Sequence, residues 1–270
     1  MDYSDIHDFL QASSDLIEMP EVKTPEYNAT RIGDWEVIDR TVDRPMRGYF
    51  NGISLVNKTP VLVRHNETGA PTVWMSLTPM ELESHAPHIE KATGTVVVGG
   101  LGLGMYVYNI LQKPEVTKVV VVEKEAAIAD MFTKIMVDDG WRALADEKLH
   151  IIIDDIIEPS KDETQELCVN ADYLYVDIWA TMCDEAALPD MVKIVEWVDP
   201  TECGWWCMEM DYISIFHRHL EVSCLAIDHS ALEDAETYFD EQYHLPVQMS
   251  TIEGYPRMLQ AFTIQMLHSL

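Results

Sequence analysis

The sequence predicts an α/β fold, a doubly wound and mostly parallel sheet preceded by a small region of one helix and antiparallel strands. Short, continuous apolar runs lie at 96–98, 119–122, 151–153 and 173–176, each separated from the next by a stretch of helical length. Continuous apolarity is typical of strands that are buried on both faces, and alternation with helices favours parallel pairing. We therefore expect the sheet to begin near residue 95.

The N-terminal region, residues 1–92, is expected to form a helix and then short antiparallel strands. Ile6, Phe9, Leu10, Leu16 and Ile17 fall on one helical face, and Pro20 ends that helix. Apolar or β-branched runs at 53–56, 61–64 and 72–77 predict strands, broken by turn-rich stretches at 57–60 and 66–69. A short helix is expected from Pro79 to about Lys91.

The second region, residues 93–270, is expected to contain the doubly wound domain. A fifth strand is predicted near 204–208, a surface helix at 231–243 with a Ser230 cap, and extended structure near 262–267. Cys203 and Cys207 are interpreted as buried small hydrophobes. Trp205 and Trp206 face opposite sides of the strand, so one is expected in the core, and the other joins the core or lines a pocket.

The composition excludes several classes of protein. The 270 residues include 18 Lys and Arg against 47 Asp and Glu, a formal charge of −29, yet 47% are hydrophobic, so a core can form. So few cations argue against binding to nucleic acid or to an anionic membrane. The excess charge indicates either a solvated surface or a preference for cationic or small neutral substrates.

Localisation is predicted from the absence of export and membrane features. No apolar run approaches the roughly 20 residues that span a bilayer. The acidic start MDYSDIHDFL is unlike a secretory signal, and the five cysteines include no CxxC pair. We therefore expect a cytoplasmic protein with reduced thiols.

Glycines and acids follow the predicted parallel strands. The first strand runs into Gly99-Gly100-Leu101-Gly102-Leu103-Gly104 and then into a helical stretch. Glycines at such a turn let a ligand approach the backbone closely. The next three strands end on Glu123, on Asp154-Asp155 and on Asp177. Because the carboxyl ends of parallel strands meet at one edge, Glu123 is placed to bind a ribose, and Asp154 or Asp155 an adenine amino group.

The stretch 52–179 resembles the class I S-adenosylmethionine-dependent methyltransferase fold, and within it the spermidine synthase-like branch. The resemblance lies in the apolar strand followed by Gly99-Gly100, in the segment 72–78, and in Glu81 with His85. It implies a Rossmann-like cofactor-binding domain at 93–270 that binds S-adenosylmethionine. Gly99, Gly100, Gly102 and Gly104 would lie against the methionine part of the cofactor. Glu123 would bind the ribose, and Asp154 or Asp155 the adenine, with Asp155 favoured.

The sequence departs from spermidine synthases at the acceptor half of the site. The glycine loop has no aspartate, Ser84-His85-Ala86 replaces a Tyr-His-Glu cluster, and Ala180 replaces a second aspartate after Asp177. We therefore favour S-adenosylmethionine over its decarboxylated relative, and methyl transfer over aminopropyl transfer. Asp177 is the candidate catalytic residue, which would orient an amine acceptor or accept its proton.

Other interpretations stay open at this point. The chain could be an aminopropyltransferase with an altered polyamine site, a non-catalytic adenosyl-binding or scaffold protein, or a nicotinamide-dependent enzyme. No metal site is predicted, although Asp154, Asp155 and Asp177 have the chemistry to hold Mg²⁺. A small-molecule substrate is expected as the partner, with homodimerisation as an option.

Overall fold

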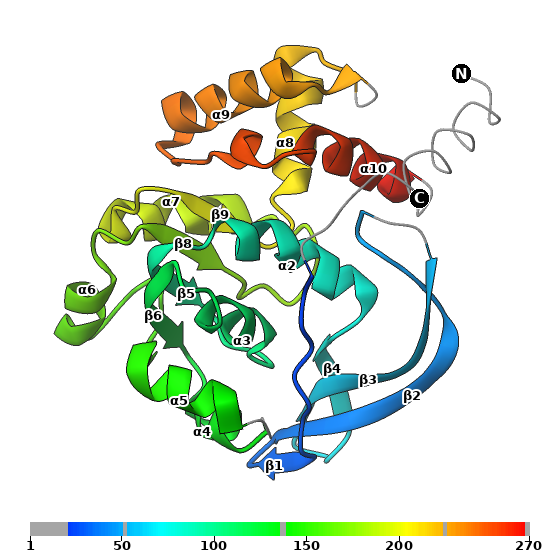
Figure 1. The fold of residues 1–270 in the computed structure, drawn as a ribbon, viewed down its shortest axis with the longest axis vertical. Helices are drawn as coiled ribbons and strands as arrows, with labels where there is room; N and C mark the ends of the chain where they lie inside the picture. The colour runs from blue at the N-terminus through cyan, green and yellow to red at the C-terminus, as the bar shows by residue number, and fades with distance from the viewer. Residues whose placement is uncertain (1–20, 51–52, 136–138, 224–225, 268–270) are drawn as a thin grey trace.

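The computed structural model describes residues 21–50, 53–135, 139–223 and 226–267, and the helix predicted before Pro20 lies outside them. The described residues form a strongly curved antiparallel sheet beside a parallel sheet that is covered by helices on both faces (Figure 1). The α/β fold with a small antiparallel N-terminal region is confirmed, and all the pairs in the second sheet are parallel.

The antiparallel sheet has the order β1-β2-β3-β4. Its strands are β1 (Thr30–Ile32), β2 (Trp35–Arg47), β3 (Ile53–His65) and β4 (Pro71–Ser76). The turn at 66–69 is confirmed, but the predicted break at 57–60 is wrong, because β3 runs through it while pairing with β2. The long ladder with β2, which the sequence analysis did not predict, outweighs local turn preferences. Pro60 fits because its carbonyl accepts from Leu77 and it needs no N–H partner there.

The parallel sheet has the order β7-β6-β5-β8-β9. Its strands are β5 (Gly94–Gly99), β6 (Val116–Glu123), β7 (Leu149–Ile153), β8 (Tyr173–Val176) and β9 (Cys203–Trp205). The chain winds outward from β5 to β7 and then crosses to β8 on the other side of β5. Ligands of open α/β sheets bind where the strand order reverses in this way. Here that point lies between β5 and β8.

Helices cover both faces of the parallel sheet (Figure 1). α3 (Met105–Leu111), α4 (Ala126–Ile135) and α5 (Asp139–Lys148) pack with Val96 and Val98 on one face. α6 (Asp162–Cys168) and α7 (Ala187–Val198) pack with Val97 and other side chains on the opposite face. Because neighbouring side chains of a strand point to opposite faces, the continuous valine run of β5 serves both cores.

The C-terminal part is helical. It comprises α8 (Glu209–Ile215), the π-helix η1 (Phe216–Leu220), α9 (His229–Tyr243), the 3₁₀ turn η3 (Met249–Thr251) and α10 (Tyr255–Leu267). The prediction of extended structure near 262–267 is wrong. Met258, Leu259 and Phe262 are buried at helical spacing in the core that surrounds Tyr49, so packing selects the helix.

Two further local predictions need correction. The fifth strand is shorter than predicted, because residues 206–208 turn into α8 rather than continuing β9. The cap of α9 is Asp228 and not Ser230, since the Asp228 carboxylate accepts from the backbone N–H of Ala231. Trp205 belongs to the core as predicted, and Cys203 and Cys207 are buried as predicted.

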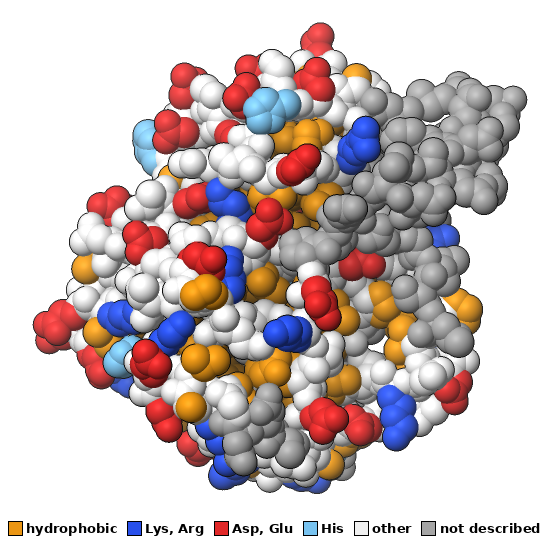
Figure 2. Space-filling view, viewed as in Figure 1, with side chains coloured by type: hydrophobic (Ala, Val, Ile, Leu, Met, Phe, Trp, Pro, Cys, Tyr) orange, Lys and Arg blue, Asp and Glu red, His pale blue; other side chains and the backbone are white. Residues whose placement is uncertain are grey.

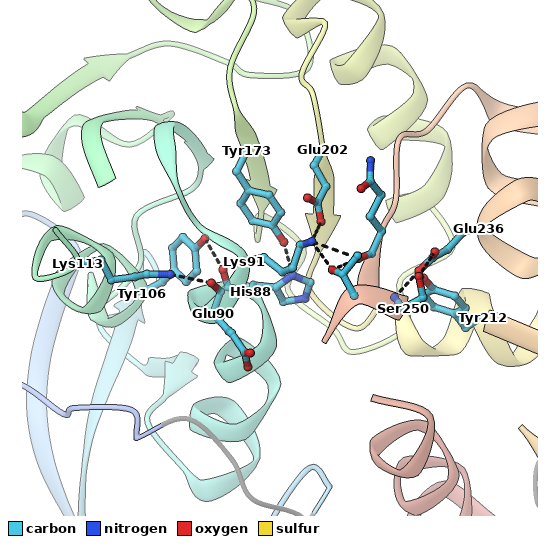
Figure 3. Close-up of polar contacts among 12 residues, drawn as sticks. His88, Glu90, Lys91, Tyr106, Lys113, Tyr173, Glu202, Tyr212, Glu236 and Ser250 are labelled. Carbon is cyan, nitrogen blue, oxygen red and sulfur yellow. Dashed lines mark hydrogen bonds and ion pairs between the residues drawn. The ribbon is translucent and has the colours of Figure 1, made fainter. Parts of the chain in front are cut away.

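Polar contacts fix helix α2 (Pro79–Lys91) between the sheet and the C-terminal helices (Figure 3). His88 Nδ1 lies 2.8 Å from the Tyr173 hydroxyl of β8. Lys91 pairs with Glu202 at 2.5 Å, and Lys113 donates to the carbonyl oxygens of Ile89 and Glu90 at the C-terminal end of the helix. These contacts position the first turns of α2, which carry Glu81 and His85.

The surface reflects the acidic composition. Asp and Glu side chains are spread over the face shown in Figure 2 rather than gathered in one patch, in a protein with a net charge of −29. None of the helices in the described ranges combines the length and the apolarity that crossing a membrane would need.

Candidate functional site

A cavity of about 550 Å³ lies at the carboxyl ends of the parallel strands, between that sheet and β4. This volume lies within the range of small-molecule and cofactor sites. Seven of the eight predicted site residues line it: Gly100, Gly102, Gly104, Glu123, Asp154, Asp155 and Asp177. The exception is Gly99, the last residue of β5, which packs closely against Val176 and Ile156.

The glycine loop requires glycine at two positions, because each has a positive φ and no room for a Cβ. Gly100 has φ +88°, and a Cβ there would lie 2.3 Å from the carbonyl oxygen of Asp177, so the loop and the end of β8 could not pack together. Gly102 has φ +51°, and its Cβ would lie 2.5 Å from Sδ of Met75. Met75 comes from β4, and its sulfur accepts from the N–H of Leu103. The antiparallel sheet therefore covers the glycine loop.

Glu123 is held beside this loop at the end of β6. One carboxylate oxygen accepts from the N–H of Leu101 at 2.8 Å, and the other from the N–H of Glu125 at 2.7 Å. Burial raises the pKa of Glu123, although these backbone hydrogen bonds oppose the rise. Each carboxylate oxygen keeps a further lone pair, so the side chain can still accept hydrogen bonds from a ligand's hydroxyl groups.

The two aspartates after β7 differ in what they do. The Asp154 carboxylate accepts from Ser160, from the N–H of Lys161 and from the Thr164 hydroxyl. Burial opposes its ionisation, but the hydrogen bonds from Thr164 and Ser160 outweigh burial and lower its pKa. Asp154 thus orders the loop before α6. Asp155 pairs with Lys124 and is more exposed than Asp154. Because of this exposure, Asp155 is the better placed of the two aspartates to meet a ligand.

A cluster of three titratable side chains stands at the other end of the cavity. Glu81 and His85 are one turn apart on α2, and Asp177 follows β8. His85 Nε2 lies 3.3 Å from Asp177 Oδ2, and ligand atoms of all three residues lie within 4.8 Å of one another. His85 Nδ1 lies 2.7 Å from the carbonyl oxygen of Glu81. A carbonyl only accepts, so Nδ1 carries a hydrogen and Nε2 gains or loses the proton.

The pKa values of Glu81 and His85 are both raised. Burial, followed by repulsion from Asp177, raises the pKa of Glu81 to about 7, against the attraction of His85. Burial alone would lower the pKa of His85, but the hydrogen bond to Asp177 and the negative charge of Glu81 raise it to about 8. Titratable groups shifted in this way inside a cavity are candidates for proton transfer.

Aromatic side chains surround the cluster. The rings of Tyr106 and Tyr175 pack with 4.4 Å between centroids and their planes tilted by 34°, and the Tyr175 ring lies 5.5 Å from that of His85. Within the described residues the buried Tyr175 hydroxyl has no hydrogen-bond partner, although Tyr175 lines the cavity. A buried polar group without a partner costs free energy, so a ligand group at this point would be favoured. Trp206 also lines the cavity, as the sequence analysis allowed.

Sequence reasoning missed this cluster as a unit. The i, i+4 spacing of Glu81 and His85 on the predicted helix indicates a shared face, but nothing in the sequence places that face against Asp177. The three side chains have the donor types and spacing to hold a divalent cation. In the part of the chain that the structure describes, Asp154, Asp155 and Asp177 do not converge into the Mg²⁺ site considered above.

The chain resembles solved structures of S-adenosylmethionine-dependent methyltransferases and spermidine synthases at low identity. Spermidine synthase from Thermotoga maritima matches with 11% identity and a TM-score of 0.32, over 52% of this chain and 50% of its own. The methyltransferase domain of a bacterial Hen1 protein matches with 12% and 0.37, over 59% and 80%. An S-adenosylmethionine-dependent methyltransferase from Clostridium acetobutylicum matches with 12% and 0.28, over 43% and 42%.

These matches concern part of the backbone arrangement only. The chain spans about half the length of the spermidine synthases it matches. No protein-family model matches the sequence, and no curated protein does. At these identities and TM-scores the likeness does not extend to the activity of the matched proteins.

Proposed function

We propose that the protein is an S-adenosylmethionine-dependent transferase that moves a methyl group to a small, cationic amine. One observation carries the proposal: a single cavity joins Glu123 and the glycine loop to the cluster of Glu81, His85 and Asp177. The end beside the glycine loop has the hydrogen-bond acceptors that an adenosyl group needs, and the other end has two carboxylates for a cation.

The residues at the end beside the glycine loop fit S-adenosylmethionine. Gly100 and Gly102 line the cavity and add no side chains of their own to it, Glu123 retains acceptor capacity for ribose hydroxyls, and Asp155 would bind the adenine edge. When bound, the cofactor supplies an activated methyl group on a sulfonium. The protein then needs mainly to orient the acceptor and to exclude water.

The residues at the other end would bind the acceptor and take its proton. The carboxylate of Asp177 would hold an ammonium group, and the tyrosine faces beside His85 would favour a cation. An amine attacks only with a free lone pair, so a base must remove its proton first. Glu81 and His85 Nε2, with pKa values of about 7 and about 8, are the groups that would receive it.

Cofactor binding is the first test. Titration calorimetry of the purified chain with S-adenosylmethionine should give saturable heat that Glu123→Ala reduces strongly. Glu158→Ala, which changes an exposed residue outside the cavity, is the matched control. A folded protein that gives no heat at millimolar cofactor would refute the proposal.

The alternatives predict other results in the same experiments. Preference for decarboxylated S-adenosylmethionine, with transfer to a diamine, would identify an aminopropyltransferase. Binding without transfer to any amine or small acid would identify a non-catalytic adenosyl-binding protein. Heat with NAD and none with S-adenosylmethionine would identify a nicotinamide-dependent enzyme.

A further inference from the structure

Two thiols from different turns meet beside the cavity. Cys183 lies in the turn after β8 and is exposed, whereas Cys207 lies in the turn after β9 and is only 3% exposed. They are 24 positions apart in the chain, yet their sulfur atoms are 3.2 Å apart. Both residues have left-handed backbones, with φ +63° and +67°. Residues other than glycine rarely adopt this conformation, so the surrounding structure must hold both turns in place.

We propose that Cys183 and Cys207 are an oxidisable dithiol that hydrogen peroxide converts into a disulfide. The sulfur atoms need to approach by only about 1.2 Å to reach the length of a disulfide bond. This inference is independent of the function proposed above, because it concerns the two thiols alone.

The environments of the two thiols give them different parts in the reaction. The hydrogen bond from Cys207 lowers the pKa of Cys183, against burial and the nearby carboxylates of Asp211 and Glu209. The same hydrogen bond and burial raise the pKa of Cys207. Thiolate character and exposure determine which cysteine is oxidised first, so Cys183 reacts with the peroxide and Cys207 resolves the product.

The reaction balances with hydrogen peroxide as the oxidant. The Cys183 thiolate attacks one peroxide oxygen, the O–O bond breaks, and the hydroxide that leaves takes a proton to become water. Cys183 is then a sulfenic acid. The Cys207 sulfur attacks it, the S–S bond forms, the S–O bond breaks, and the departing hydroxide takes the Cys207 proton as a second water.

The disulfide would tether one wall of the cavity to the core. Residues 178–186 form an irregular, partly exposed segment that contributes Ile178, Trp179 and Met182 to the cavity. Cys207 is anchored in the core, where it contacts the buried Tyr49. Oxidation would therefore restrict the segment that directly follows Asp177.

The test oxidises the full chain. The reduced protein is treated with a small excess of hydrogen peroxide, digested without reductant and mapped by mass spectrometry. We expect a peptide pair joined through Cys183 and Cys207, and amide hydrogen exchange in 178–186 that is slower by at least threefold than in the reduced protein. Cys203→Ala and Cys224→Ala should still form the pair.

Single variants separate the two parts of the reaction. Cys183→Ser, at an exposed position, should abolish the disulfide. Cys207→Ala should leave a Cys183 sulfenic acid that dimedone traps, whereas the wild type should give little adduct. The proposal is overturned if peroxide leaves both thiols free in the wild type, drives Cys183 to sulfinic acid with no disulfide, or joins other cysteines instead.

Discussion

Replacing Glu81 with Gln tests the electrostatics of the candidate acceptor site directly. The ordinary pKa of Glu81, 4.5, rises to about 7, mainly through burial and then through repulsion from Asp177. The folded protein therefore holds this proton at pH values where the unfolded chain has lost it. Stability falls as the pH rises from 4.5 to 7, and the cost then stays constant.

The magnitude follows from the same shift. One pKa unit corresponds to about 1.4 kcal/mol, so the raised pKa of Glu81 costs the fold about 1.4 kcal/mol at pH 5.5 and about 3 kcal/mol at pH 8. Gln has nearly the same shape and never ionises. We therefore expect Glu81→Gln to raise the free energy of unfolding above that of the wild type. This gain should be about 2 kcal/mol larger at pH 8 than at pH 5.5.

Urea unfolding of both proteins at the two pH values measures this difference. Groups that do not interact with Glu81 contribute equally to both proteins and cancel from the comparison of differences, whereas His85, whose pKa the charge of Glu81 raises, does not. Glu90→Gln, on the exposed side of the same helix, is the control and should show no such change. A Glu81→Gln gain that is equal at both pH values, or larger at pH 5.5, would refute the assignment of a raised pKa to Glu81.

The other predictions concern the activity and the glycine loop. Asp177→Asn should lower methyl transfer to an amine by about 100-fold while the calorimetric affinity for S-adenosylmethionine stays within a factor of about two; equal losses in both would contradict its placement at the acceptor end. In the wild type, kcat/KM should rise between pH 6.5 and 8.5 as Glu81 and His85 lose protons, and a flat profile would contradict that role. Gly102→Ala should lower the free energy of unfolding by about 1–3 kcal/mol, because of its φ of +51° and the contact with Met75. Adding Met75→Ala should recover only part of this loss in urea unfolding, since the backbone strain remains, and full recovery would show that strain is absent.

The parallel sheet and the end of the cavity beside the glycine loop were predictable because their causes are local. A strand buried on both faces must be apolar throughout, so the valine runs of β5 and β6 are visible in the sequence. Parallel strands bring their carboxyl ends to one edge, which places Glu123 and Asp155 beside the glycine loop. The predicted residues at this end, except Gly99, line one cavity for that reason.

The antiparallel sheet and the C-terminal helices were less predictable because their secondary structure depends on contacts with residues elsewhere in the chain. β3 continues through Pro60 because β2 pairs with it, and α10 is a helix because Phe262 packs on Tyr49, more than 200 positions earlier. Local preferences favour a turn at 57–60 and a strand at 262–267. Tertiary packing commonly overrides such local preferences.

The doubly wound sheet, the glycine loop and the acids at the rim of the sheet can be predicted from the sequence alone, because each follows from strand burial and chain order. Which acids lie together is set by tertiary packing. It engages Asp154 in holding its own loop, and it brings Glu81 and His85 of α2 against Asp177 of the sheet. It also brings Cys183 to Cys207. Contacts between elements far apart in the chain depend on packing angles and anchoring side chains such as His88, and a one-dimensional pattern does not encode them locally.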